Sequence, residues 1–313
     1  MAGLILRRLA STAIVMTVVA LFVFGMLHLA PGDPAAIIAG DIATQEDIAR
    51  IRAKLGLDRP LVEQFLVWLG HILSGDLGRS IFSDRPVAEL VAQRMEPTLA
   101  LAVTTMLFSV VVAVPMGILA AWRAGSWIDR LVMSFAVLGF SVPVFVFAYV
   151  LILLFAVNLK WLPVMGYVSF REDLGGFFKS LAMPTLALGV TYIALIARIT
   201  RASMLEVIHQ DYIRTAHAKG LALAPILLRH ALKPASVPIV TTIGIGVALL
   251  IGGVVVTESV FAIPGLGRLT VDAILRRDYP IIQGVILIFS GVYVLINLVI
   301  DIVYTILDPR IRY

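Results

Sequence analysis

Six long apolar runs dominate this sequence of 313 residues and constrain its fold more than any other feature. Each run is about 20 residues long, which is enough to cross the hydrocarbon core of a bilayer as a helix. Lipid offers backbone N–H and C=O groups no partner, and no run alternates apolar and polar residues as a barrel strand would. We therefore predict an all-α polytopic membrane protein whose six transmembrane helices lie near residues 9–30, 98–122, 131–157, 181–197, 238–257 and 281–300.

Composition supports this fold class, because 60% of the residues are apolar, whereas a soluble domain is nearer to half apolar. The first run could alternatively be a cleaved signal peptide, since Arg7 and Arg8 precede it. Its length favours a retained span, because the apolar core of a signal peptide is typically about 7–15 residues long.

The distribution of charge predicts the orientation of the chain. If the N-terminus is inside, the inner segments hold twelve basic residues against four acidic ones. This asymmetry follows the positive-inside rule, so we assign both termini and residues 198–237 to the cytoplasm. The cations are scattered at membrane boundaries, which disfavours a nucleic-acid patch. The basic residues are Arg7, Arg8, Arg123, Arg130, Arg198, Arg201, Arg214, Lys219, Arg229, Lys233, Arg310 and Arg312, and the acidic ones are Asp129, Glu206, Asp211 and Asp308.

The sizeable outer segment, residues 31–97, contains residues that typically start and end short helices. Thr44 suits the cap of a helix that stops at Gly56, and Pro60 suits the first turn of a helix that runs towards Gly75. Pro86 suits a third helix. We predict a small helical outer cap that, with the first span, makes up residues 1–97.

A second outer segment, residues 258–280, contains the turn signal Pro264-Gly265 followed by LTVDAILRR. These residues predict a short amphipathic helix that lies along the outer surface. The remaining chain, residues 98–308, is the predicted membrane core, with a cytoplasmic loop at 205–237.

The sequence carries no evident catalytic, metal or cofactor site. It lacks cysteine, a G-x-x-x-x-G-K-[ST] phosphate loop and any close pair of histidines. The spans are nearly bare of ionisable groups, and Glu258, Asp301 and His28 fall near their ends, where boundary residues bonded to neighbours are expected. Residues 244–253, GIGVALLIGG, predict tight helix packing through small residues rather than a dinucleotide loop.

Residues 211–234, DYIRTAHAKGLALAPILLRHALKP, form a charged, helix-patterned stretch between two apolar runs. Asp211 suits the start of a helix, Lys219 suits its end, and Gly220 can adopt the left-handed conformation that stops it. Pro225 then opens a second helix, and Pro234 is expected to end that helix near Lys233.

The first of these helices has an unusual face. Asp211 and Arg214 can pair at i,i+3, and the small side chains at two positions of the face permit close approach by another surface. One hypothesis is that residues 211–234 form a solvated loop with no specific function. We favour the hypothesis that they dock a soluble partner, which binds the helix in a groove. The face comprises Tyr212, Ile213, Ala216 and Gly220.

Several short segments, taken in order, resemble the inner-membrane permease subunit of a bacterial ABC importer. The family is that of the dipeptide, oligopeptide and nickel permeases, and the resemblance is to the first of its two permease types. The similarity runs nearly end to end. It is carried by HLAPGDPA, LGLDRPLVEQFLVWLGHILSGDLGRSI, DYIRTAHAKGL, LLRHALKPASVP, ESVFAIPGLGRL, RDYPIIQG and DPRIRY. The implied fold is that of a type I ABC importer permease.

The resemblance implies that RTAHAKG is the coupling helix, the family's E-A-A-x-x-x-G loop that docks on an ATPase subunit. Arg214 stands where many ABC importers have Glu, Thr215 where they have Ala, and Pro234 where peptide permeases commonly have Asn. The implied docking residues are Tyr212, Ile213, Arg214, Thr215, Ala216, Lys219 and Gly220.

The resemblance also implies a function and its partners. The chain would form half of an alternating-access pathway for di- and oligopeptides in the bacterial inner membrane and would not be an enzyme. It would pair with a second, related permease, two ATPase subunits that bind ATP and Mg²⁺, and an extracytoplasmic solute-binding protein that lands on residues 31–97 and 258–280. Neither a cofactor on this chain nor a nucleic-acid partner is expected.

Three alternatives remain open at this point. The same architecture could import nickel chelates, glutathione or another small solute. The chain could instead work alone as a channel or ion-coupled carrier. It could also be a membrane receptor or scaffold without transport.

Overall fold

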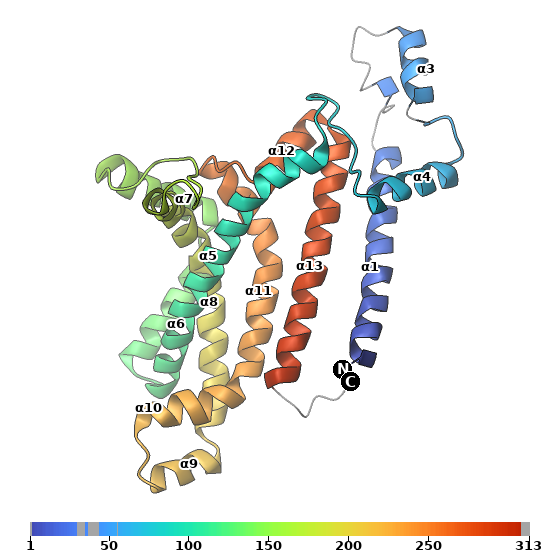
Figure 1. The fold of residues 1–313 in the computed structure, drawn as a ribbon. Helices are drawn as coiled ribbons and strands as arrows, with labels where there is room; N and C mark the ends of the chain where they lie inside the picture. Colours follow the sequence, from blue (N-terminus) through green and yellow to red (C-terminus); the bar gives the residue numbers. More distant parts are fainter. Residues whose placement is uncertain (1, 30–34, 37–43, 55, 308–313) are drawn as a thin grey trace. The chain divides into compact units, whose positions relative to one another are not determined.

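The computed structural model describes residues 2–29, 35–36, 44–54 and 56–307, and these residues are predominantly helical (Figure 1). Within these ranges no strand occurs, and β-type pairing is limited to an isolated bridge between Arg79 and Pro86. The all-α class predicted from the sequence is confirmed.

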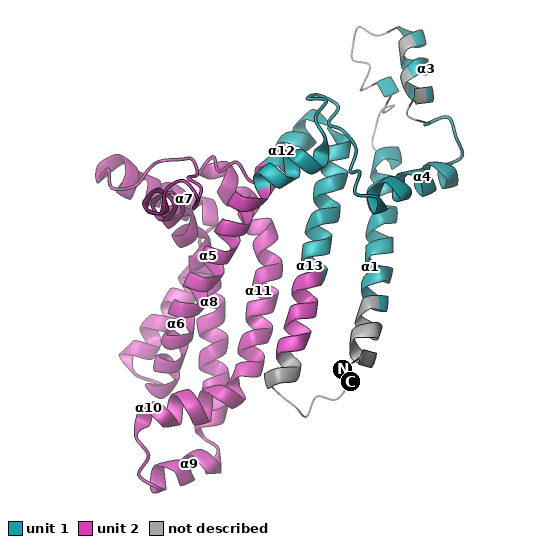
Figure 2. Cartoon of the chain, viewed as in Figure 1, with its two compact units in different colours: residues 1–94, 269–294 teal, residues 95–268, 295–313 magenta. Residues whose placement is uncertain are grey.

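The chain forms two compact units (Figure 2). Unit 1 comprises residues 1–94 and 269–294, and unit 2 comprises residues 95–268 and 295–313. The division expected from the sequence, between residues 97 and 98, stays a prediction. Residues 269–294, however, group with the N-terminal part of the chain rather than with the core.

Unit 1 contains the first apolar helix, α1 (Ala2–Leu29), and the short helices predicted for the outer cap. Helix α3 (Gln45–Lys54) begins where the Thr44 carbonyl accepts a bond from Ile48 N, and Gly56 follows it with a φ of +66°. Helix α4 (Leu61–Leu73) begins after Pro60 and is followed by Gly75 at a φ of +85°. Proline and left-handed glycine therefore set these boundaries as predicted.

Unit 2 is organised around α8 (Leu174–Ile208), the most buried of the long apolar helices. In its most apolar window 72% of the residues are buried, compared with 11% in the corresponding window of α1. It packs against α6 (Trp127–Ser141), α7 (Val144–Leu151) and α11 (Leu232–Val260). The core of unit 2 therefore lies along α8.

Helices α5, α12 and α13 each cross from one unit to the other. Their bounds are α5 (Val87–Trp122), α12 (Leu266–Arg276) and α13 (Tyr279–Leu307). Helix α5 runs without a break through Pro97, so the third helix expected after Pro86 and the second span are one helix. At 36 residues it is about 54 Å long, which exceeds the hydrocarbon thickness of a bilayer. Helix α12 matches the amphipathic helix predicted between the last two spans.

Five of the predicted spans are single apolar helices, whereas the third, residues 131–157, is broken. Its two parts, Trp127–Ser141 and Val144–Asn158, meet at an angle of 103°. The break has a local cause, because Pro143 lacks an N–H and pushes the preceding residue out of the helical region. Val142 is accordingly extended, with φ of −94° and ψ of 122°. The second part ends in a π-helical stretch, η1 (Ile152–Asn158).

The prediction that Pro234 ends the second helix of the charged stretch is wrong. Helix α10 (Leu223–Pro225), the π-helical η2 (Ile226–Ala231) and α11 follow one another without interruption, and together they form a 38-residue apolar helix. Pro234 lies within this continuous helix, three residues after the π-helical stretch. The i→i+5 bonds of that stretch displace the regular i→i+4 ladder, so the missing N–H of Pro234 is tolerated there.

Glycines bring the helices of unit 2 into close contact. A Cβ at Gly117 of α5 would lie 2.7 Å from the Ala197 carbonyl oxygen, and one at Gly139 of α6 would lie 2.9 Å from the Ala194 Cβ. In α11 a Cβ at Gly253 would lie 2.8 Å from a methyl group of Leu188, which confirms the packing role predicted for residues 244–253. Small residues permit this approach where apolar burial gives no advantage over lipid.

The Gly117→Ala substitution tests the close contact between α5 and α8. The new methyl group meets backbone, which cannot move aside as a flexible side chain would, so we expect a loss of about 1–3 kcal/mol in stability. The measurement is the midpoint of thermal unfolding of the detergent-solubilised chain, with loss of monodispersity as the readout. Gly252→Ala of α11 is the matched control, because nothing lies within 4 Å of its Cβ. Equal midpoints for the two variants would contradict the contact.

Candidate functional site

The charged stretch predicted to dock a partner begins with helix α9 (Asp211–Ala218), which lies beyond the ends of α8 and α11 (Figure 1). Asp211 occupies the first turn, and Gly220 follows the helix with a φ of +76°. The N–H groups of Gly220 and Leu221 donate to the carbonyls of His217 and Ala216. This pair of bonds is the Schellman motif, which closes a helix through a left-handed residue. The predicted start and stop of the helix are confirmed.

One side of α9 is buried in the core of unit 2. Ile213 is 1% exposed and Ala216 is 7% exposed, and both belong to the same apolar cluster as Ile226 and Ala231 of η2. Helix α9 also packs directly on η2. The short helix is therefore attached to the start of the long η2–α11 helix by apolar contacts.

The opposite side of α9 is exposed. Tyr212 keeps 46% of its surface exposed, and partial burial raises the pKa of its hydroxyl, so the side chain is a neutral hydrogen-bonding group at physiological pH. Arg214 and Asp211 form the predicted i,i+3 ion pair, with Nη1 and Oδ1 3.3 Å apart. Thr215 donates its hydroxyl to the carbonyl of Asp211, and Lys219 is exposed at the end of the helix.

The structure thus divides the seven residues predicted to dock. Tyr212, Arg214, Thr215, Lys219 and Gly220 are exposed, whereas Ile213 and Ala216 face the chain's own core. The small side chain of Ala216 allows α9 to pack closely on the rest of unit 2. The docking role of the whole set stays a prediction.

A buried ion pair fixes the last turns of α8, next to the start of α9. Arg201 of α8 donates from Nε and Nη2 to the two carboxylate oxygens of Asp129 at 2.5 and 2.7 Å. Asp129 of α6 also accepts from Gly125 N at 2.9 Å, and its side chain is 7% exposed. This geometry is the bidentate arrangement that orients guanidinium and carboxylate most firmly.

From the sequence Asp129 and Arg201 are two boundary charges, and their contact is not predicted. The sequence does indicate that Asp129 has a basic partner, because the predicted inner segments hold only four acidic residues, Asp129 among them, against twelve basic ones. The partner could not be identified, since the two residues are 72 positions apart and several arginines were available.

A second buried carboxylate in unit 2 anchors the start of α12. Glu258 is fully buried; its Oε1 accepts the Thr98 hydroxyl at 2.5 Å, and its Oε2 accepts Arg268 N at 2.9 Å. The Thr98 hydroxyl in turn accepts Leu266 N at 2.8 Å. The two side chains together satisfy N–H groups at a helix start, as a cap does. Glu258 is therefore a boundary residue bonded to its neighbours, as predicted.

Nearby in unit 2, Glu96 holds the loop that follows η1. Its Oε1 accepts the Tyr167 hydroxyl at 2.9 Å and the Ser169 hydroxyl at 2.6 Å. Burial and the hydrogen bond to Glu96 raise the pKa of Tyr167, so this phenol remains a proton donor throughout the physiological range.

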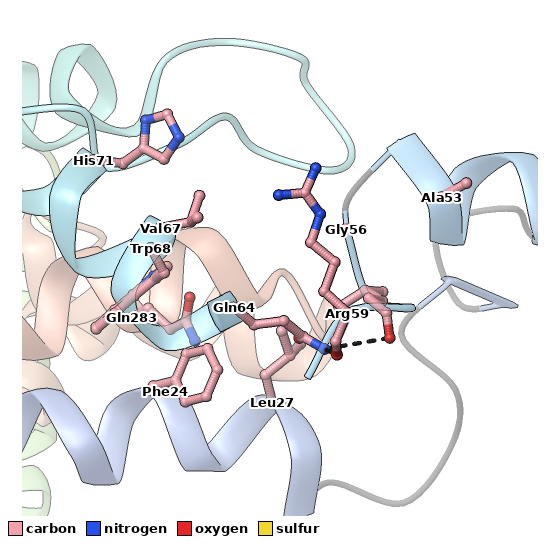
Figure 3. Close-up of a pocket in the computed structure, with 11 residues that line it drawn as sticks. Phe24, Leu27, Ala53, Gly56, Arg59, Gln64, Val67, Trp68, His71 and Gln283 are labelled. Atoms are coloured by element: carbon pink, nitrogen blue, oxygen red, sulfur yellow. Dashed lines mark hydrogen bonds between the residues drawn. The ribbon is translucent and has the colours of Figure 1, made fainter. Parts of the chain in front are cut away.

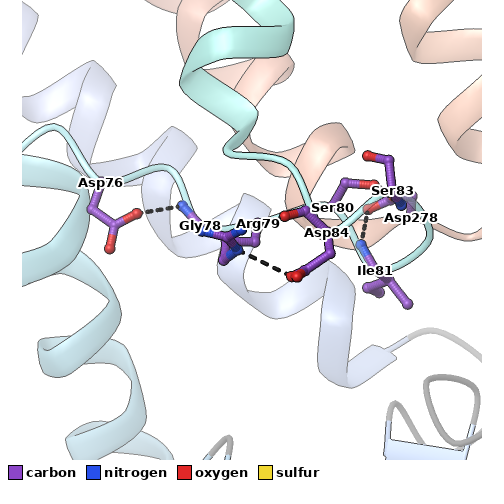
Figure 4. A network of polar contacts seen from close by, with 8 residues as sticks. All are labelled: Asp76, Gly78, Arg79, Ser80, Ile81, Ser83, Asp84 and Asp278. Atoms are coloured by element: carbon purple, nitrogen blue, oxygen red, sulfur yellow. Dashed lines mark hydrogen bonds and ion pairs between the residues drawn. The ribbon is translucent and has the colours of Figure 1, made fainter.

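A buried carboxylate also organises unit 1 (Figure 4). Asp278, 2% exposed, lies between α12 and α13 and accepts the Ser80 hydroxyl at 2.6 Å and Ile81 N at 3.3 Å. The loop it holds is closed by an ion pair between Arg79 and Asp84, with Nε and Oδ1 3.0 Å apart. A carboxylate that accepts several bonds in this way positions a loop and offers no free group for catalysis.

Unit 1 also contains a hollow of about 370 Å³ (Figure 3). Its polar side chains are bonded within unit 1: Gln64 donates to the Arg59 carbonyl at 2.8 Å, and the Arg59 guanidinium pairs with Glu63, outside the lining, at 3.1 Å. Across the described part of the chain no three His, Cys, Asp or Glu side chains gather as metal ligands would. The lining residues are Phe24, Leu27, Ala53, Gly56, Leu57, Arg59, Gln64, Val67, Trp68, His71 and Gln283.

Comparison with protein-family models gives two matches that together cover most of the chain. Residues 113–313 match the model described as binding-protein-dependent transport system inner membrane component. Residues 1–102 match the model of the N-terminal part of such membrane components.

Curated relatives align over nearly their whole length. A probable peptide ABC transporter permease protein of Sinorhizobium fredii is 56% identical over 99% of both chains. A putative peptide transport system permease protein of Brucella abortus is 46% identical over the whole of both chains. A glutathione transport system permease protein of Salmonella paratyphi A is 43% identical, again over the whole of both chains.

Among solved structures, the fold is similar to a chain of the MetNI methionine ABC transporter in an inward-facing conformation. The TM-score is 0.58 at 21% identity, and the match covers 70% of this chain and 96% of that one. The type I ABC importer permease fold predicted from the sequence is thereby confirmed.

The Asp129→Asn substitution tests the buried ion pair. It leaves the Arg201 guanidinium without a charged partner, and we expect it to cost about 3 kcal/mol of stability, near the lower end for broken buried pairs because Arg201 is 25% exposed. The combined change Asp129→Leu with Arg201→Met should recover most of the loss. The measurement is thermal unfolding of the solubilised chain.

The matched control for this prediction is Asp211→Asn, which breaks an exposed pair whose side chains are 95% and 75% exposed and should change the midpoint little. If Asp129→Asn and Asp211→Asn unfolded alike, the Asp129–Arg201 pair would not be an anchor.

Proposed function

The chain belongs to the family of binding-protein-dependent transport system inner membrane components, and we propose that it forms half of the pathway of an ATP-driven ABC importer for di- and oligopeptides. As a member of this family it is a multi-pass protein of the inner membrane and a component of a transport system. The observation that carries the proposed mechanism is α9, a short helix with one side buried in the core of unit 2 and one side exposed.

The orientation in this proposal follows the charge asymmetry of the sequence. Basic residues flank the ends of the spans on the α9 side, so this side and both termini face the cytoplasm. Helix α9 is then accessible to soluble proteins of the cytoplasm, and residues 31–97 and 258–280 are accessible from outside.

Helix α9 acts as the coupling helix. A partner that pulls on its exposed side transmits force through Ile213 and Ala216 to η2 and α11. The Asp129–Arg201 pair ties the last turns of α8 to α6, so that α8, which leads into α9, and α6 move together. Contact through packed, rigid elements of this kind is the physical route by which a distant event biases a pathway.

The proposal requires partners. Six helices of one chain hardly enclose a path for a peptide, so a second, related permease completes the pathway. Two ATPase subunits bind ATP and Mg²⁺, hydrolyse the nucleotide and bind the coupling helices. This chain itself catalyses no reaction. A solute-binding protein delivers peptide to the outer segments, and specificity for the cargo resides largely in that protein.

Glutathione is the second candidate cargo, because a relative 43% identical over its whole length is a glutathione permease protein. Peptides remain the first candidate, since the relatives at 56% and 46% identity are described as peptide permeases. Uptake of a labelled dipeptide into proteoliposomes that hold the complete transporter, with glutathione as competitor, distinguishes the two. A peptide importer retains dipeptide uptake in excess glutathione.

Gly220→Val tests the coupling role. Gly220 lies at φ of +76° with nothing within 4 Å of its Cβ, so a valine strains the turn and fills the space that a docked ATPase would occupy. We expect at least a tenfold loss of ATP-driven uptake, which corresponds to about 1.4 kcal/mol of coupling. The measurement is uptake together with co-purification of the ATPase subunits.

Gly166→Val is the matched control, because Gly166 has a φ of +104° and also has nothing within 4 Å of its Cβ. It carries backbone strain of the same kind in the loop that follows η1. Equal effects of the two substitutions would attribute the loss to strain alone and would overturn the docking role of Gly220.

A flux measurement separates this proposal from a channel, a carrier or a scaffold. The purified chain in liposomes should pass no solute, whereas the complete assembly should import it with ATP. Flux through the chain alone would establish a channel or carrier, and an assembly that binds ATPases without substrate-stimulated hydrolysis would establish a scaffold.

A further inference from the structure

Helix α4 of unit 1 carries an apolar stripe that its own unit leaves uncovered. Val62, Leu66 and Leu73 are 71%, 60% and 79% exposed. The first two are separated by four residues and the last two by seven, so they lie on one side of the helix. A water-exposed stripe of this kind is unfavourable, and it indicates a surface that contacts something apolar.

The neighbouring side of α4 is packed against α1 and α13. Trp68, Leu69 and Ile72 pack against a buried cluster formed by Val23 and Ala20 of α1 and Leu287 of α13. Phe65 lies edge-on to Phe24 of α1, with ring centroids 5.4 Å apart. The rotation of α4 about its own axis is thus fixed within unit 1, and the direction of the exposed stripe is fixed with it.

A third side of α4 is polar. Glu63 forms an ion pair with Arg59 at 3.1 Å, and His71 lies 3.5 Å from the Asp76 carboxylate. These side chains are more than half exposed. Helix α4 therefore has one face packed on protein, one apolar face and one polar face, which also carries the half-exposed Val67.

The contacts of α4 with α1 give its depth in the membrane. The apolar span of α1 comprises Ala10–Leu29, whose 20 residues are about 30 Å long and match the hydrocarbon core. Leu29 therefore lies at the edge of the hydrocarbon. Helix α4 touches the two turns before that edge, where Gln64 Oε1 accepts a bond from His28 Nε2 at 3.0 Å and Trp68 lies 5.7 Å from the Phe24 ring.

The direction of α4 suits the same location. Figure 1 shows α4 running across the axis of α1 near its C-terminal end. A helix that crosses a spanning helix at the edge of the hydrocarbon lies in the plane of the interface. Aromatic side chains such as Trp68 gather at this depth in membrane proteins. Leu21 and Phe22 of α1, 51% and 65% exposed, show that apolar surface of unit 1 reaches almost to this level.

We propose that α4 is an interfacial helix, with Val62, Leu66 and Leu73 inserted among the acyl chains of the bilayer leaflet at the C-terminal end of α1. Its charged side, with Glu63 and His71, faces the headgroups and water. Unit 1 is then held at a fixed depth by α1 and α4 together. The lipid-facing stripe is not available to a solute-binding protein, so any docking on residues 31–97 uses other surfaces.

Spin labelling tests this proposal directly, because the chain contains no cysteine and each variant carries a single label. Leu66→Cys and Leu73→Cys report on the apolar stripe, and His71→Cys, on the charged side of the helix, is the matched control. The labelled full-length chain is placed in nanodiscs of phosphatidylethanolamine and phosphatidylglycerol. Collision of the nitroxide with oxygen, which concentrates in acyl chains, is compared with collision with a water-soluble nickel chelate.

The expected result is a several-fold higher ratio of oxygen to nickel accessibility at positions 66 and 73 than at position 71. Ratios at 66 and 73 as low as the ratio at 71 would place the stripe in water and overturn the proposal. Labels at 66 and 73 that are shielded from both reagents would mean that protein covers the stripe, which also overturns it. The measurement involves no transport, so its outcome is independent of the proposed function.

Discussion

The lack of hydrogen-bond partners in lipid is the constraint on which this structure depends. It makes each apolar run a helix, because a helix satisfies its own backbone, and it leaves little hydrophobic force to hold the helices together. Unit 2 answers the second problem with small residues. Gly117, Gly139 and Gly253 allow α5, α6 and α11 to approach α8 at distances that any larger side chain would prevent. The central position of α8 follows from these contacts.

Polar anchors occur where helices end, and each joins segments far apart in the sequence. In unit 2, Asp129 and Arg201 join α6 to α8, and Glu258 with Thr98 caps the start of α12. In unit 1, Asp278 holds the loop around Ser80. Each carboxylate is buried with partners already in place, because an unpaired buried charge would be far more costly than a paired one. The anchors thus determine geometry, while the apolar contacts contribute most of the buried area.

Helix α9 combines these two kinds of interaction in eight residues. Its buried side chains attach it to η2, and its exposed side carries the polar groups that a soluble partner can recognise. A helix this short is not stable alone, so its conformation depends on the unit beneath it. Because of that dependence, a movement of α9 also moves the long helices on which it packs, as the proposed transport mechanism requires.

Features that depend on local chemistry are predictable from the sequence alone. The apolar runs predict the spans, proline and left-handed glycine predict the ends of α3, α4 and α9, and the spacing of Asp211 and Arg214 predicts their ion pair. Other features follow only from tertiary packing: which side of α9 is buried, that the helix continues past Pro234, and which arginine meets Asp129. The difference lies in the range of the interactions, because caps, turns and i,i+3 pairs depend on neighbours within one helical turn. Burial and pairing across 72 residues depend on how whole helices pack, which no short stretch of sequence contains.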